Sequence, residues 1–266
     1  MVHLKNYWHC AALSCPKRFK MICPFLSLLY YLVMALLSLA LYFVIKKKID
    51  LVKKTLFTSM MVTGLGIITL ILTEHRLPLY GAFEASFYLI FVLTLMEILF
   101  WKNKTPSIHL RSCGATAVLS FCLLLYHIMQ PKEFNPDFFM YGNPWVNLFF
   151  NLRLTAAAIF SRTALLYQMG IWGKNSKQTI FFSHARTLLL MGLVVFLCSE
   201  WAGSWWCLNW LGDSWQWSKG FFKAAIVFML VMLTCHLPPS LVRNAWIKGM
   251  TGSLPALFLM WTIFYH

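Results

Sequence analysis

The sequence predicts an all-α protein, a polytopic membrane helix bundle of about eight transmembrane helices. Of its 266 residues, 60% are hydrophobic and only 12% are charged. The mean hydropathy is +0.67, above that of a soluble globular domain of this length. Apolar runs close to the length that crosses a bilayer recur along the whole chain. We therefore expect one transmembrane bundle, residues 22–266, behind an N-terminal tail of residues 1–21.

The predicted spans follow one another with short polar connections. The first run is longer than the apolar core of a cleavable signal peptide, and no small-residue cleavage site follows it, so we interpret it as a permanent span. No internal repeat divides the chain, so the spans form a single bundle. The eight segments lie near 22–45, 55–73, 83–101, 113–130, 145–172, 186–206, 220–237 and 249–265.

Basic residues in the connections predict the orientation, because lysine and arginine favour the cytoplasmic side. They gather in the odd-numbered connections, and the even-numbered ones are nearly neutral or acidic. We therefore expect both chain ends outside, although the basic N-terminal segment opposes this orientation. The net charge is +15, but short clusters between apolar runs fit membrane topology, with no nucleic-acid partner. The clusters are Lys46, Lys47, Lys48, Lys53 and Lys54; Lys102, Lys104 and Arg111; Lys174, Lys177 and Arg186; Arg243 and Lys248.

Sequence signatures of several other protein classes are missing. The eight cysteines form no C-x-x-C pair and are scattered, most of them among apolar residues, so neither a zinc site nor a disulfide framework is expected. The chain has no phosphate-cradling glycine loop, no H-E-x-x-H and no G-x-S-x-G. The sequence therefore identifies no catalytic residue.

Six of the twelve tryptophans lie in WAGSWWCLNWLGDSWQW, residues 201–217. We expect an outer, tryptophan-rich loop at 200–220. One interpretation is an interfacial belt, since tryptophan is enriched among lipid headgroups. The other is a ligand platform, because Trp201 and Trp205, like Trp206 and Trp210, are i,i+4 pairs that share a helical face. Such a surface suits a flat apolar ring with anionic edges, such as a porphyrin, whose iron histidines would bind.

This segment also resembles a known motif. It is similar to the WWD motif of the cytochrome c assembly proteins, most closely the CcsA/ResC-like haem-handling branch. The matching positions are Gly192, Gly203, Trp206, Gly212, Trp215 and Trp217, with His236 closing the next span. A second family pattern, P-L-x-x-x-[YF]-E after a histidine, is matched by His75, Pro78, Leu79, Phe83 and Glu84.

The resemblance implies a role in c-type cytochrome biogenesis. Such proteins carry b-type haem to the outer face of the membrane and present it to apocytochrome c. They act with a ResB-type partner, as a component of a cytochrome c haem lyase. For this chain, the implied haem-binding residues are Trp201, Trp205, Trp206, Trp210, Trp215, Trp217, Asp213, His75, Glu84, Arg153, His236 and His266, and the candidate iron ligands are His236, His266 and His127.

The chain departs from the family pattern at several places, one of which is Leu211, where the family has a tryptophan. Ser218 occupies the position of the motif's aspartate, and Asp213 is the nearest acid. The helix before the motif lacks the family's outer histidine, which His127 would have to replace, and we expect His266 to replace the family's second outer histidine. Two other functions therefore stay open: a membrane transporter whose aromatic residues anchor it, and an assembly subunit that has lost haem ligation.

Glu97, Arg153 and Arg162 are among the charged side chains that fall inside predicted spans. An unpaired charge in the hydrocarbon is costly, so one interpretation is an Arg–Glu pair between helices. The functional alternative places Arg153 against a haem propionate below the tryptophans. For His236 the alternatives are a transmembrane haem site used during entry and a hydrogen-bonded histidine between helices.

Overall fold

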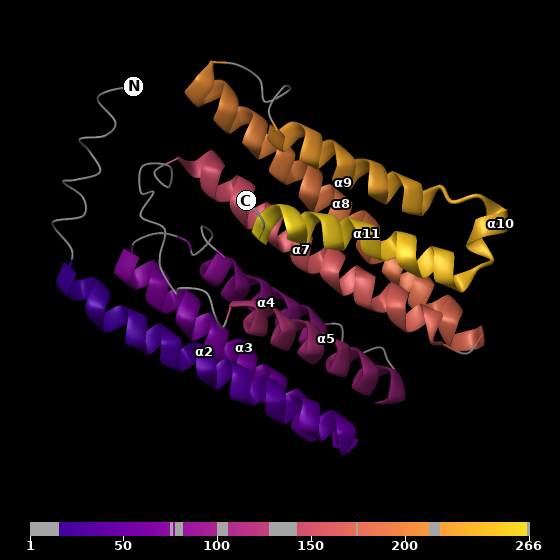
Figure 1. The fold of residues 1–266 in the computed structure, drawn as a ribbon, viewed down its shortest axis with the longest axis horizontal. Coiled ribbons are helices and arrows are strands. Elements are labelled where there is room, and N and C mark those ends of the chain that lie inside the picture. The colour runs from indigo at the N-terminus through magenta and orange to yellow at the C-terminus, as the bar shows by residue number, and fades with distance from the viewer. Residues whose placement is uncertain are drawn as a thin grey trace.

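The computed structural model describes residues 16–74, 77, 82–99, 106–127, 143–173, 175–212 and 219–264. All regular secondary structure in these ranges is helical (Figure 1). The helices are α2 (Pro16–Ile45), α3 (Ile49–Glu74), α4 (Ala82–Leu99), α5 (Pro106–His127), α7 (Pro144–Ile171), α8 (Asn175–Leu211), α9 (Lys219–Cys235), α10 (Pro239–Val242) and α11 (Ala245–Phe264).

Each of the eight predicted segments coincides with a long helix, and the short α10 follows α9. Several helices extend beyond their apolar run, because polar residues continue the helix after the hydrophobic pattern ends. In α8 the helix begins at Asn175, well before the predicted start at 186, and continues to Leu211. Within the described residues, five helices are long and apolar enough to cross a membrane: α2, α3, α5, α8 and α11.

The long helices form two groups that lie side by side (Figure 1). Helices α2, α3, α4 and α5 pack together, and α7 packs with α8 and α11, while α9 lies against α11. Helix α7 joins the groups, because it also contacts α4 and α5. Consecutive helices alternate in direction. We call the end where α7 begins and α8 finishes the tryptophan end, and the opposite end, where α2 finishes and α11 begins, the basic end.

Small residues let α7 lie close to its neighbours. Ala156, Ala157 and Ala158 are fully buried. Gly192 of α8 faces Phe160 of α7, where an added Cβ would lie 2.7 Å from the ring. Gly192 is one of the positions that match the family motif, and close packing of α7 on α8 is sufficient to explain a glycine there.

A buried ion pair connects the two groups of helices. Arg162 of α7 and Glu97 of α4 approach to 2.5 Å, with 1% and 0% of their side chains exposed. Ser112 donates to the Glu97 carboxylate at 2.8 Å and Thr116 donates to it at 3.1 Å, both from α5. Arg162 donates to Thr116 at 2.8 Å, and also to Ser112. The predicted Arg–Glu pair between helices is confirmed, and its partners satisfy both charges.

Candidate functional site

The start of α7 positions Trp145, which was not predicted to belong to the site. Asn143 caps the helix, since its Oδ1 accepts a hydrogen bond from the Trp145 backbone N–H at 2.9 Å, and Pro144 occupies the first helical position. Trp145 therefore lies in the first turn of α7. Because α8 runs antiparallel to α7, the last turns of α8 reach the same level.

Three tryptophan rings from α7 and α8 meet at this level. Trp145 stacks on Trp205, with ring centroids 5.9 Å apart and planes 20° from parallel. Trp201 stands perpendicular to Trp145 at 5.5 Å and to Trp205 at 6.2 Å. Trp201 and Trp205 remain 56% and 41% exposed. We call Trp145, Trp201 and Trp205 the aromatic cluster.

The aromatic cluster includes no other tryptophan of residues 201–217 whose side chain is described. Trp206 turns toward the bundle and packs on Phe149 of α7, with centroids 6.2 Å apart. The predicted loop at 200–220 is helical as far as Leu211, and Gly212 then adopts a left-handed conformation (φ 66°), which commonly ends a helix. The side chain of Trp210 lies outside the described residues.

A second ion pair lies next to the aromatic cluster, toward the middle of the bundle. Arg153 Nη1 lies 3.3 Å from Glu200 Oε1, and the two side chains are 11% and 15% exposed. The guanidinium also lies over the rings of Phe149 at 5.0 Å and Phe196 at 5.9 Å. The predicted span 186–206 and the predicted loop 200–220 both included Glu200, and the structure places it within α8. The predicted contact of Arg153 with a haem propionate therefore has Glu200 as a competitor.

His236 lies at the basic end, directly after α9. Its side chain is exposed, and Nδ1 is 2.9 Å from the carbonyl oxygen of Met232. Helix α9 has 17 residues, which separates its ends by about 25 Å. His236 and the aromatic cluster are therefore at opposite ends of the bundle, so one haem cannot contact both.

The ends of α5 and α11 meet at the tryptophan end. The rings of Tyr126 and Phe264 lie 6.3 Å apart. His127, the last residue of α5, follows Tyr126 directly, and its side chain lies outside the described residues. Within the described part of the chain, no group of three or more His, Cys, Asp or Glu residues has the geometry to hold a metal ion.

The remaining predicted site residues divide into two sets. Glu84 is buried in the first turn of α4, where a carboxylate interacts favourably with the helix dipole. The others, which lie outside the described residues, are His75, Asp213, Trp215, Trp217 and His266.

Comparison with known proteins does not extend this description: no protein-family model matches the chain, and no curated protein matches it significantly.

Two site residues were not identified from the sequence. Trp145 was counted only as the beginning of a span, although the Asn-Pro-Trp sequence at 143–145 is a helix-start signal that places it opposite the end of the following helix. Glu200 was counted among the charges of a connection, although the predicted span 186–206 already included it. The sequence offered one signal for the pairing of Glu200 with Arg153. Glu200 stands near the end of an apolar helix, and Arg153 stands near the start of the preceding helix.

Proposed function

We propose that this protein handles haem at the tryptophan end of the bundle and presents it to an apocytochrome c, with a ResB-type membrane partner. The observation that carries the proposal is the aromatic cluster: two exposed indole rings from α8 braced by a third from α7. None of its three rings is among the tryptophans that match the WWD motif, Trp206, Trp215 and Trp217, so the cluster supports a ring-binding surface separately from that resemblance. The basic end, rich in lysine and arginine, would face the cytoplasm.

The depth of the cluster supports a platform at the membrane surface. Gly192 of α8 packs near the middle of α7, and Trp201 and Trp205 follow it by about 13 and 20 Å along the helix axis. Half the thickness of the hydrocarbon is about 15 Å. If the helix middle lies at the bilayer centre, the two rings lie at the headgroup level, where a porphyrin face could stack on them and its propionates stay in water.

Candidate iron ligands follow from the contact between Tyr126 and Phe264. His127 comes directly after Tyr126, and His266 is two residues beyond Phe264 in the sequence. We assign these two histidines to the haem at the tryptophan end. His236 would serve a different haem position, at the basic end, in keeping with a role during entry. The chain would supply binding and orientation, while the thioether chemistry belongs to the haem and the apocytochrome thiols.

The test compares two sets of tryptophan variants of the purified protein. The first, Trp145→Leu, Trp201→Leu and Trp205→Leu combined, removes the aromatic cluster. The control, Trp172→Leu with Trp246→Leu, removes an exposed pair at the basic end whose rings lie 6.0 Å apart. We expect haem, measured as the pyridine haemochrome after loading, to fall by at least tenfold in the first variant and to stay at the wild-type level in the control.

Two results would oppose this function. Equal haem content in the wild type and the cluster variant would remove the platform, and the tryptophans would then be membrane anchors. A colourless wild-type protein that still co-purifies with a ResB-type partner would favour the assembly subunit without haem ligation. Three histidines have described side chains, and none of them belongs to the aromatic cluster, which supports that second function. They are His109, His184 and His236.

A further inference from the structure

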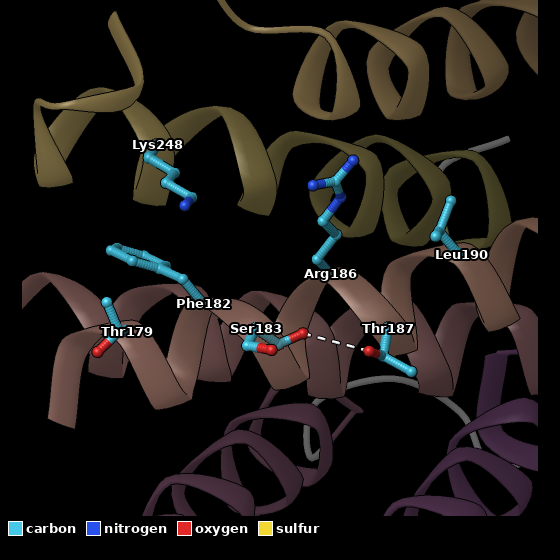
Figure 2. A pocket seen from close by; sticks show the side chains of 7 residues that line it. All are labelled: Thr179, Phe182, Ser183, Arg186, Thr187, Leu190 and Lys248. Atoms are coloured by element: carbon cyan, nitrogen blue, oxygen red, sulfur yellow. Dashed lines mark hydrogen bonds between the residues drawn. The ribbon is translucent and has the colours of Figure 1, made fainter. Parts of the chain in front are cut away.

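A hollow of about 510 Å³ opens between α8 and α11 near the basic end (Figure 2). Most of its wall is one face of α8, because the lining residues of that helix are three or four positions apart. Lys248, in the first turn of α11, closes the opposite side. The lining residues are Thr179, Phe182, Ser183, Arg186, Thr187, Leu190 and Lys248.

Two cations from different helices approach this hollow. Arg186 rises from α8 toward α11, and Lys248 descends from α11 toward α8 (Figure 2). The Lys248 ammonium lies 4.6 Å from the centre of the Phe182 ring, which fixes its direction. None of the seven lining side chains is acidic.

No acidic residue compensates these charges within the described part of the chain. Glu97 and Glu200 are each paired with an arginine elsewhere in the bundle. Neither Arg186 nor Lys248 forms an ion pair with a described residue. The two like charges repel one another unless an anion lies between them. Thr187 donates its hydroxyl to the Ser183 carbonyl oxygen at 3.3 Å, and the wall between the cations also carries the Ser183 hydroxyl, which can donate a hydrogen bond.

We propose that this hollow binds a phosphate-bearing anion between Arg186 and Lys248. Arginine offers a planar fork of donors for phosphate oxygens and lysine a point charge. The hydroxyl of Ser183, on the exposed side of α8, lies between the two cations along the wall. Phe182 and Leu190 give the hollow apolar surface, which a glycerol backbone and the first acyl carbons of a lipid would cover. The phosphate could belong to a lipid headgroup or to a soluble ion.

The experiment measures retention of anionic lipid and of free phosphate by the detergent-purified protein. In the first arm, native mass spectrometry follows binding from equal amounts of phosphatidylglycerol and phosphatidylcholine. In the second arm, equilibrium dialysis measures binding of inorganic phosphate. The variant Arg186→Gln with Lys248→Gln removes both cations. The control, Lys48→Gln with Lys54→Gln, removes the same charge from exposed positions at the basic end, outside the hollow.

We expect the wild type to prefer the anionic lipid, and the double variant to bind it about tenfold more weakly, because charge-assisted hydrogen bonds are lost. The control should bind as the wild type does. Preference for the lipid without phosphate binding assigns the site to a headgroup. Phosphate binding that the double variant loses assigns it to a soluble ion. Equal binding by the wild type and the double variant in both arms overturns the proposal.

A steric variant keeps the test decisive if loss of both cations prevents folding. Ser183 lines the hollow and is exposed on α8. The variant Ser183→Leu therefore fills the hollow while both charges remain. We expect this variant to elute as the wild type does on size exclusion and to lose anion binding. Full binding by the Ser183→Leu protein would also overturn the proposal, because the anion would then lie elsewhere.

Discussion

The ion pair between Glu97 and Arg162 allows a quantitative prediction about stability. Both side chains are essentially inaccessible, with 0% and 1% exposed. Replacing Arg162 with Leu removes the counter-charge and leaves the Glu97 carboxylate in the bundle with only hydroxyl donors, from Ser112 and Thr116. Water cannot replace the guanidinium there, because α4, α5 and α7 enclose the site.

The expected magnitude follows from this burial. Removing one partner of a buried pair costs about 3–5 kcal/mol of unfolding free energy, whereas replacing both partners with apolar residues is often neutral. In the double variant Glu97→Leu with Arg162→Leu, Ser112 and Thr116 lose their charged partners, at a cost of about 1 kcal/mol each. We therefore expect Arg162→Leu to be less stable than the double variant, despite carrying fewer substitutions.

Unfolding in mixed micelles of SDS and a mild detergent, followed by tryptophan fluorescence, measures each free energy, and the four proteins complete a double-mutant cycle. Arg111→Leu is the matched control, because Arg111 lies exposed on α5; it should change stability by less than about 0.5 kcal/mol. The reasoning is refuted if Arg162→Leu costs less than about 1 kcal/mol, or if the two single changes simply add.

Three further predictions concern other positions. Gly252→Ala should destabilise the bundle by about 1–3 kcal/mol in the same unfolding assay, because the new Cβ would overlap the Tyr167 ring where α11 crosses α7. Glu200→Gln should cost about 1–3 kcal/mol, because both carboxylate oxygens are buried beside Arg153, and the amide keeps an oxygen that accepts a hydrogen bond but loses the charge. His236→Ala should retain the haem that loss of the aromatic cluster removes, because His236 lies at the opposite end of the bundle; the pyridine haemochrome measures this.

Each of these predictions has an outcome that contradicts it. Gly64→Ala is the control for the glycine variant, because its new Cβ would lie 3.3 Å from the Phe91 ring, a contact that a small shift relieves; equal losses at the two glycines would mean that close packing of α11 is not the cause. A loss of less than about 0.5 kcal/mol for Glu200→Gln would mean that the charge of this carboxylate does not stabilise its contact with Arg153. Loss of all haem from the His236 variant would contradict separate haem positions at the two ends.

The helices themselves were predictable, and their exact ends were not. Apolar runs predicted the positions of the eight long helices in the described part of the chain, because a backbone that crosses lipid must satisfy its hydrogen bonds within the helix. Hydropathy is insensitive to polar residues that continue a helix, so the start of α8 at Asn175 and its end at Leu211 were missed. The predicted span 186–206 and the predicted loop 200–220 overlapped, and the structure assigns Glu200 and the first tryptophans to the helix.

The sequence by itself determined the helical character of the chain and a concentration of tryptophan near one helix end, and it offered an Arg–Glu pair as one of two interpretations, since each depends on residue type and local spacing. Only the tertiary structure decided which residues meet. It selected Glu97 for Arg162 and Glu200 for Arg153, and it brought Trp145 from another helix onto Trp205. Such partners are set by helix crossing and rotation, which depend on small residues packing across helices rather than on the periodicity within any one of them.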